Sequence, residues 1–328
     1  MKTKKPVIII LGEPNSVFIE ILSKVLKKNT IVKKLNYPLI IIGSKKLIIS
    51  QLNLLKSKIN FESLFEKEIT NKFKNKLYLI DVKYKFTKPF EKISYNSKNY
   101  ISECFKIALE FVDKGVSDII VNGPISKKHF LQNKYPGITE YIYFKSKKKI
   151  SNNPVMLIYN KKLSVSPLTT HIPLKNVNKK IKLKTIINNV LLINNFYKNK
   201  LNVSPKIAIT GLNPHCETSS KYSEELRIIK PAIKSLRKQN ININGPYPAD
   251  TFFLKENLKY FNVLVGMYHD QILTPFKTLF GFDASNITLG LPFLRLSVDH
   301  GPNNKMIGKN KSSTSSLENI FKLIHSLK

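Results

Sequence analysis

The chain has 328 residues, of which 42% are hydrophobic and 23% are charged. This composition excludes a disordered protein, and the length suffices for one large domain or two linked domains. The 55 Lys and Arg residues against 21 Asp and Glu residues give a formal net charge of +34.

The positive charge comes almost entirely from lysine, because arginine occurs only as Arg227, Arg237 and Arg295. Arginine is the side chain favoured for bidentate contacts with phosphates and bases. The lysines are spread along the whole chain. We therefore expect no specific nucleic-acid binding and attribute the charge to a compositional bias toward Lys, Asn and Ile, with weak polyanion affinity as a by-product.

No apolar stretch approaches the roughly 18 residues of a membrane span. The basic start is followed by the apolar run 7–11, which is shorter than the hydrophobic region of a signal peptide and has no cleavage site after it. The two cysteines, Cys104 and Cys216, are too few for a disulfide framework. We expect a cytoplasmic protein with no membrane partner.

Short apolar runs alternate with longer helical patterns along the chain. Residues 7–11 predict a strand, and residues 17–26 predict the helix after it. The pattern continues with a strand at 39–43, an amphipathic helix at 100–113, a strand at 119–121, a helix at 183–197, strands at 207–211 and 263–266, and a last helix after the serine cluster 312–316. Strands that alternate with helices indicate an α/β protein with a mainly parallel sheet.

Three histidines follow short apolar runs in similar surroundings. His171 lies in Thr-Thr-His-Ile-Pro-Leu, His215 in Gly-Leu-Asn-Pro-His and His269 in Tyr-His-Asp-Gln. Each should lie just past a strand, at the sheet edge where ligands bind in parallel α/β folds. Three imidazoles there would hold a divalent metal with open positions for substrate oxygens. Each histidine alone is more simply a hydrogen-bonding loop residue, so the hypothesis rests on all three.

Two cations lie in segments rich in glycine, proline and apolar residues, namely Lys277 and Arg295. Such surroundings suggest partial burial, and buried cations usually need anionic partners. A phosphate or carboxylate of a substrate would serve. The alternative is an internal salt bridge to Asp270, Asp283 or Asp299.

Asp250 ends the segment Gly-Pro-Tyr-Pro-Ala-Asp, whose prolines and glycine predict a rigid turn that aims the carboxylate. The same residue would also serve as a helix cap before residues 251–258. Cys216 directly follows His215, and we interpret it as a small residue in a tight turn and not as a nucleophile.

These motifs occur in a familiar order with Val-Asn-Gly-Pro-Ile-Ser-Lys at 121–127 and Thr-Leu-Gly-Leu-Pro at 288–292. Together they resemble the 4-hydroxythreonine-4-phosphate dehydrogenase (PdxA) family, and the resemblance covers nearly the whole chain. It implies the two-domain α/β fold of the isocitrate and isopropylmalate dehydrogenases, with an active-site cleft between the domains and a homodimer that shares its active sites. We place the first domain at 1–130 plus 270–328 and the second, dimerising domain at 131–269.

The resemblance also implies roles for individual residues. Three histidines would bind one divalent metal (zinc, cobalt or magnesium), and four other residues match substrate-binding positions. The metal ligands are His171, His215 and His269; the substrate contacts are Thr139, Lys277, Asn286 and Arg295; the candidate catalytic residues are Asp250 and Lys277; and the candidate contacts of NAD or NADP are Asp299 and His300.

The implied reaction is the NAD-dependent oxidation of 4-phosphooxy-L-threonine to a β-keto acid. This acid loses CO2 to give 3-amino-2-oxopropyl phosphate, a precursor of pyridoxal 5'-phosphate. A bound metal would polarise the substrate alcohol and hold the enolate that forms on decarboxylation.

Several positions depart from the family pattern. Ile138 stands where the family has histidine, so part of a phosphate contact should be lost, and nothing indicates that His129 replaces it. The first loop, residues 12–20, lacks two of the family's glycines. Two alternatives therefore remain: a sister dehydrogenase of threonate or erythronate phosphate, and a decayed relative or polyanion-binding protein. Retention of all three histidines favours an active enzyme.

Overall fold

The structure is a computed structural model that describes residues 4–28, 36–65, 73–135, 137–146, 153–216 and 221–327. The chain divides into two compact units. Unit 1 comprises residues 1–150 and 291–325, and unit 2 comprises residues 151–290 and 326–328. Both divisions therefore fall later in the chain than the expected boundaries at 130 and 269.

Packing explains where the division falls. Helix α6 (Ile138–Lys145) belongs to unit 1 because Ile138 and Tyr141 are part of its apolar core. Strand β11 (Ser285–Leu289) belongs to unit 2 because it pairs along its whole length with β6 (Val155–Tyr159). Neither contact is visible as a break in the sequence composition.

The sheet of unit 1 has the strand order β3-β4-β2-β1-β5-β12, and all of its neighbouring strands are parallel. Its strands are β1 (Val7–Ile10), β2 (Leu39–Gly43), β3 (Glu62–Ser63), β4 (Leu77–Asp81), β5 (Ile119–Asn122) and β12 (Leu294–Val298). The sheet is buried on both faces, which is why its central strands read as continuous apolar runs.

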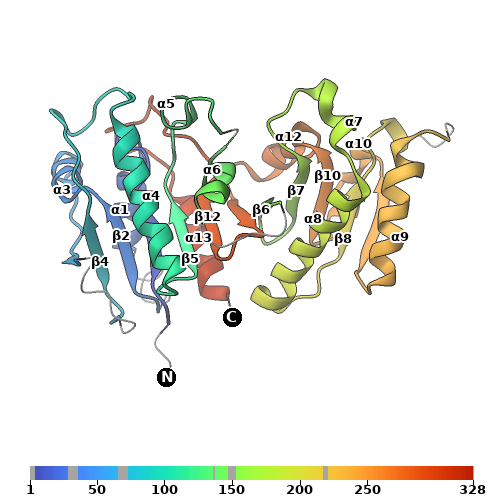
Figure 1. Ribbon diagram of the computed structural model, residues 1–328, viewed down its shortest axis with the longest axis horizontal. Helices are drawn as coiled ribbons and strands as arrows, with labels where there is room; N and C mark the ends of the chain where they lie inside the picture. The colour runs from blue at the N-terminus through green and yellow to red at the C-terminus, as the bar shows by residue number, and fades with distance from the viewer. Residues whose placement is uncertain are drawn as a thin grey trace. The chain divides into compact units, whose positions relative to one another are not determined.

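Helices cover this sheet, as Figure 1 shows for α4 in front of the strands. The helices of unit 1 are α1 (Phe18–Lys27), α3 (Lys45–Leu54), α4 (Ser97–Asp113), α5 (Lys127–Leu131), α6 and α13 (Ser315–Ser326). Alternate strand residues such as Ile8, Ile10 and Ile40 share a core with the apolar face of α4, as expected when successive side chains of a strand point to opposite faces.

The sheet of unit 2 has the strand order β11-β6-β7-β10-β8-β9. Its remaining strands are β7 (Ser164–Thr169), β8 (Ile207–Thr210), β9 (Ile243–Tyr247) and β10 (Val263–Tyr268). The pairs β7–β10, β10–β8 and β8–β9 are parallel, whereas β6 pairs antiparallel with both β11 and β7. The carboxyl ends of β7, β10 and β8 therefore meet at one edge.

The main helices of unit 2 are α8 (Leu183–Phe196), α9 (Lys230–Lys238) and α12 (His269–Phe280). Helix α12 begins where β10 ends and packs Ile272, Leu273 and Phe276 against the sheet. Shorter elements are η2 (Leu174–Asn176), α7 (Val177–Lys180), η3 (Tyr197–Leu201), η4 (Pro214–Cys216), η5 (Glu225–Ile229), α10 (Ala249–Phe252) and α11 (Lys255–Leu258), of which η3 and η5 are π-helical.

The predicted α/β class with a mainly parallel sheet is confirmed, and so are the predicted strands and helices named above, to within a few residues at their ends. Within the part of the chain that the structure describes, no helix is long and apolar enough to cross a membrane.

Candidate functional site

The three predicted metal ligands follow three neighbouring parallel strands of unit 2. Thr169 of β7 pairs with Tyr268 of β10, His269 comes directly after Tyr268, and His171 comes shortly after Thr169. Strand β8 lies on the other side of β10, and His215 lies in η4 beyond its end. We call the carboxyl ends of β7, β10 and β8, with these three histidines, the histidine edge.

Two imidazoles of the histidine edge lie side by side, since the ring centroids of His171 and His269 are 5.7 Å apart. Nδ1 of His269 lies 2.6 Å from Oδ1 of Asp270. A carboxylate oxygen only accepts, so Nδ1 carries the hydrogen, and in the neutral imidazole Nε2 then keeps a free lone pair. A histidine held by a carboxylate in this way is the usual form of a metal ligand.

A hollow of about 400 Å³ opens at these two residues. It is lined by Thr169, His171, Ile172, Leu174, Val177, Tyr268, His269 and Asp270. The hollow lies entirely within unit 2, and a small ligand can reach the two imidazoles through it.

His215 lies beside a second carboxylate and is highly exposed. Its Nδ1 lies 3.8 Å from Oδ2 of Asp250, and its side chain is 81% exposed. Among the residues that the structure describes, no three His, Cys, Asp or Glu side chains converge closely enough to hold an ion. The donor types and their placement at one edge fit a divalent metal.

The backbone at two of the histidines is unusual. His171 has a φ of 52° and His215 a φ of 54°, which places both in the left-handed region that costs most residues other than glycine about 1–2 kcal/mol. Such conformations persist where the surrounding structure holds them, and they are concentrated at functional sites.

Side chains that the sequence did not single out hold the turn before His215. The carboxylate of Glu225 accepts hydrogen bonds from the backbone N–H groups of Leu212 and Asn213, and Gln271 donates to the carbonyl of Gly211. Gln271 was part of a recognised motif but had no assigned role. Glu225 is a buried acid in a lysine-rich chain. Two adjacent glutamates, Glu224 and Glu225, are unusual in such a sequence and could have indicated a functional role.

Unit 1 holds the predicted substrate residues Thr139 and Arg295. Arg295 in β12 is only 5% exposed. Its Nε donates to Oδ1 of Asn122 at 2.8 Å and its Nη1 donates to Oγ1 of Thr139 at 3.2 Å. We call Arg295, Asn122 and Thr139 the arginine group. Asn122 ends β5, the strand next to β12, so sheet pairing brings Asn122 close to Arg295, while Thr139 comes from α6.

Burial lowers the pKa of Arg295 to about 10, while Glu140 acts in the opposite direction. The guanidinium therefore stays charged at neutral pH. Burial also lowers the pKa of Lys127, where Glu140 raises it and Arg295 lowers it further, so Lys127 is within electrostatic reach of the arginine group. Ile138, which replaces the family's histidine, lies beside Thr139 with 8% exposure in the apolar core.

The other two predicted substrate residues, Lys277 and Asn286, lie in unit 2. Nζ of Lys277 in α12 lies 4.9 Å from the ring centroid of Phe282, a cation–π contact. Oδ1 of Asn286 in β11 is buried, and no hydrogen-bond partner for it exists among the described residues. A buried acceptor in this state needs a donor from elsewhere.

The predicted cofactor contacts follow β12 in unit 1. The backbone N–H of Asp299 donates to Oγ of Ser316 at 3.0 Å. Nδ1 of His300 lies 2.9 Å from the carbonyl oxygen of Gly301, which accepts only, so Nδ1 carries the hydrogen. Nε2 is then an acceptor, and it is buried without a hydrogen-bond partner in the described part of the chain.

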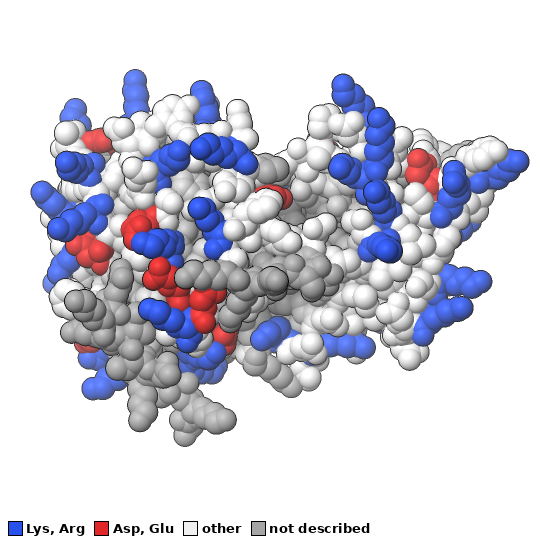
Figure 2. All heavy atoms as spheres, viewed as in Figure 1, with Lys and Arg blue, Asp and Glu red and all other residues white. Residues whose placement is uncertain are grey.

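The basic side chains are spread over the surface. Figure 2 shows Lys and Arg side chains scattered singly and in small groups, with Asp and Glu side chains between some of them, and with a closer run of basic side chains at the upper right of the view. The absence of specific nucleic-acid binding stays a prediction.

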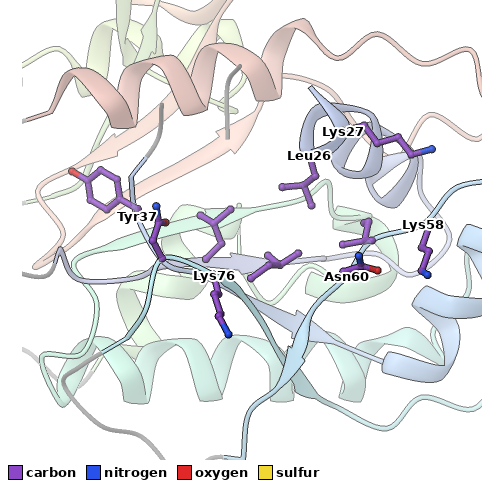
Figure 3. A pocket seen from close by; sticks show the side chains of 10 residues that line it. Leu26, Lys27, Tyr37, Lys58, Asn60 and Lys76 are labelled. Carbon is purple, nitrogen blue, oxygen red and sulfur yellow. The ribbon is translucent and has the colours of Figure 1, made fainter. Parts of the chain in front are cut away.

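Another hollow, of about 300 Å³, lies in unit 1 at the amino ends of β2 and β4. Its floor is apolar and includes Leu39 and Leu77. Figure 3 shows the labelled Lys27, Lys58 and Lys76 around it with their ammonium groups directed outward. This is the strand edge opposite to the one where parallel sheets bind ligands, so we do not assign it to the site.

Comparison with known proteins gives a consistent result. The family model described as pyridoxal phosphate biosynthetic protein PdxA matches residues 34–324. A 4-hydroxythreonine-4-phosphate dehydrogenase of Sulfurihydrogenibium sp. is 39% identical over 315 residues, which are 94% of each chain. A D-threonate 4-phosphate dehydrogenase of Salmonella typhimurium is 32% identical over 71% of each chain.

Solved structures agree with these sequence matches. The crystal structure of a 4-hydroxythreonine-4-phosphate dehydrogenase from Burkholderia phymatum superposes with a TM-score of 0.77 at 25% identity and covers 99% of this chain and 98% of that one. The isocitrate dehydrogenase of Methylococcus capsulatus superposes with a TM-score of 0.51 at 8% identity, covering 98% of this chain and 85% of that one. This second likeness supports the predicted isocitrate dehydrogenase-like fold.

Proposed function

The chain belongs to the pyridoxal phosphate biosynthetic protein PdxA family of oxidoreductases, and we propose that it oxidises 4-phosphooxy-L-threonine with NAD in a divalent-metal-dependent reaction. The product is a β-keto acid that decarboxylates to 3-amino-2-oxopropyl phosphate. The observation that carries the proposal is the histidine edge, where three imidazoles follow three adjacent parallel strands.

His171, His215 and His269 would hold the metal. When bound, a zinc, cobalt or magnesium ion would act as a Lewis acid on the substrate's secondary alcohol. The Asp270 carboxylate holds His269 so that Nε2 is available. Asp250 is placed to do the same for His215 after a small movement, since the two side chains are 3.8 Å apart and both are exposed.

Two residues of unit 2 are proposed to act on protons during the reaction. Asp250 Oδ2 would accept a proton, either from the alcohol or from His215 Nδ1. Lys277 carries three N–H donors and would hold a substrate anion or return a proton to the product carbon. The Lys277 ammonium lies against the ring of Phe282, which restricts its movement without neutralising it.

The substrate's charged ends have preformed partners. The arginine group offers a buried guanidinium held in place by Asn122 and Thr139, and a phosphate or carboxylate would bind it. The buried Oδ1 of Asn286 would accept from the substrate's ammonium or hydroxyl group. Loss of the family's histidine at Ile138 removes one donor from the phosphate contact.

The cofactor is proposed to contact Asp299 and His300. Nε2 of His300 is a buried acceptor without a donor among the described residues, and an amide or amino N–H of NAD or NADP would supply one. A carboxylate at this point favours a ribose hydroxyl over a 2'-phosphate, so we propose NAD as the preferred cofactor.

Unit 2 is proposed to form a homodimer that shares its active sites. Among the residues that the structure describes, eight of the thirteen exposed large apolar side chains belong to this unit, and Leu174, Tyr222 and Tyr260 are at least 60% exposed. A contiguous apolar patch marks an interface, and we propose that these side chains contribute to one. Light scattering on the purified protein should give twice the chain mass; a monomer at micromolar concentration would contradict this part of the proposal.

A second substrate is favoured by one relative, the D-threonate 4-phosphate dehydrogenase. D-threonate 4-phosphate carries a hydroxyl where 4-phosphooxy-threonine carries an ammonium, and Oδ1 of Asn286 accepts from either. NADH formation at 340 nm with each compound, at equal metal and NAD, decides between them. We expect a higher kcat/KM for 4-phosphooxy-L-threonine. A preference for the threonate would transfer the assignment to the sister enzyme, and turnover of neither would indicate a decayed relative.

A further inference from the structure

The turn that presents His215 is held by a buried carboxylate from a distant segment. Oε1 of Glu225 accepts from the backbone N–H groups of Leu212 at 2.7 Å and Asn213 at 2.9 Å. Oε2 of Glu225 accepts from the side-chain amide of Asn213 at 2.9 Å. Three donors of one turn therefore end on one carboxylate.

The position of Glu225 shows that these contacts are built into the fold. Glu225 is fully buried, with 0% exposure, on the π-helical segment η5. A buried carboxylate is costly unless its oxygens are hydrogen-bonded, and within the described residues its three hydrogen bonds go to the 211–213 turn. Single π-helical turns are frequent at functional sites.

Gln271 also forms hydrogen bonds to the start of this turn. Its Nε2 donates to the carbonyl of Gly211 at 2.8 Å, and its Oε1 accepts from Thr210 Oγ1 at 2.9 Å and from the backbone N–H of Met267 at 2.7 Å. Gln271 lies in the first turn of α12, close to His269. The turn before His215 is thereby fixed to the element that carries a second histidine.

Close packing leaves the turn little freedom. A Cβ added to Gly211 would lie 2.9 Å from Oε1 of Glu225 and 2.9 Å from Sγ of Cys216, so the carboxylate reaches the turn only because residue 211 is glycine. His215 itself has a left-handed backbone and a side chain that is 81% exposed. Its direction is therefore set by the backbone of the turn, since its side chain has few contacts of its own.

We infer that Glu225 is a positioning residue of the candidate site, whose carboxylate holds the 211–213 turn and so fixes where the backbone of His215 lies at the histidine edge. The inference deepens the proposed function and rests on it for the identity of the ligand. The hydrogen bonds themselves are independent of any ligand, so they can be tested separately.

The test compares Glu225→Leu, Glu225→Gln and the matched control Glu224→Gln. Glu224 accepts from the same Asn213 amide at 2.9 Å but is only half-buried and bonds no backbone N–H of the turn. Leucine removes every acceptor at similar volume, whereas glutamine keeps one acceptor oxygen and serves if the leucine variant does not fold. Circular dichroism establishes folding before either measurement.

The first measurement is amide hydrogen exchange of the peptide that contains Leu212 and Asn213, without metal. We expect exchange about tenfold faster or more in Glu225→Leu, a smaller increase in Glu225→Gln and none in Glu224→Gln. The second measurement is Co2+ affinity with the visible spectrum of the bound ion. We expect about 10- to 100-fold weaker binding and an altered spectrum in Glu225→Leu, since a displaced His215 changes the ligand geometry.

Unchanged exchange and unchanged Co2+ affinity in both Glu225 variants would overturn the inference, and so would equal effects in Glu224→Gln. If the wild-type protein took up no Co2+, the metal part of the proposed function would fail. The exchange rates would then decide alone whether Glu225 holds the turn.

Discussion

The histidine edge of unit 2 and the arginine group of unit 1 are built in opposite ways. The side chains of His215 and His269 are 81% and 39% exposed and lie beside carboxylates that are themselves exposed. Arg295 is 5% exposed and is fixed by Asn122 and Thr139. Under the proposed function, the anion contact would be complete before substrate arrives, whereas the metal contact would be completed by side-chain movement.

The difference follows from what each ligand needs. A guanidinium that is already oriented loses little conformational entropy when it binds a phosphate. A metal ion orders the imidazole side chains that bind it, so before binding only the backbone of each histidine needs to be correctly positioned. The turn held by Glu225 and Gln271 provides that position for His215.

The largest effect is expected at Lys277 of α12, in the same unit as the histidine edge. Lys277→Met keeps the length of the side chain but removes its charge and its protons, so kcat should fall about 10²- to 10⁴-fold with little loss of stability. Lys259→Met, an exposed lysine of the same unit, is the control. Steady-state NADH formation and thermal unfolding measure both quantities. A kcat equal to that of the control would remove Lys277 from the catalytic residues.

The next effect tests how far the arginine group is preformed. Arg295→Lys keeps the charge but loses the planar fork that bonds Asn122 and Thr139, so KM for the phosphorylated substrate should rise about 10- to 100-fold. The matched control is Arg237→Lys, because Arg237 likewise donates to an asparagine side chain, and in addition to a backbone carbonyl. Equal KM changes in both variants would show that the fork at Arg295 does not bind substrate.

A medium effect is expected at Asn286, where binding and stability should separate. Asn286→Leu removes a buried acceptor that no described residue satisfies, so KM should rise about tenfold while the melting temperature holds or increases. Asn160→Leu is the control, because the Asn160 side chain bonds Asp283 and Lys162 and its loss should lower the melting temperature. A lowered melting temperature in Asn286→Leu, with unchanged KM, would contradict the assignment.

A smaller effect of mixed sign is expected at Ile138. Ile138→His restores the family's donor but places an imidazole in the apolar core of unit 1, at a cost of about 1–3 kcal/mol. The melting temperature should fall and KM for the phosphorylated substrate should fall with it. A higher KM would show that the anion contact in this chain has been rebuilt around isoleucine.

The smallest effect concerns Glu13, which follows β1 at the same strand edge as Asn122. Burial raises the pKa of Glu13, while hydrogen bonds from Asn15 and Ser97 lower it. A folded-state pKa above 4.5 means that stability falls as the pH rises from 4.5 through the raised pKa. Glu13→Gln should therefore melt slightly above the wild type at pH 7, and the gap should close toward pH 4.5. A difference in melting temperature that grows as the pH falls would show that the pKa of Glu13 is lowered by folding and would contradict this prediction.

Much of the site was predictable because the family's motifs place residues at strand ends. His171, His215 and His269 were expected to share an edge, and the strand order places their strands side by side. The sequence could not show that Glu225 reaches the turn before His215, because that contact joins a π-helical segment to a loop through hydrogen bonds and has no periodic signature. It also could not show that Ile138 is part of a core.

The domain boundaries were harder to predict for a related reason. Helix α6 joins unit 1 through side chains that pack on α4 and α5, and β11 joins unit 2 by pairing antiparallel with β6. Both contacts join segments that are separated in the sequence, and no stretch of linker-like composition marks the domain boundary near either of them.

The most direct test of the central claim is substrate-dependent NADH formation on chelator-treated protein during stepwise return of Co2+ or Zn2+, with His215→Ala measured beside the wild type. We predict no turnover without metal, full turnover at about one metal per chain, and a loss of metal-dependent turnover in the variant. Equal turnover before and after metal removal, or a fully active His215→Ala protein, would contradict a catalytic metal at the histidine edge.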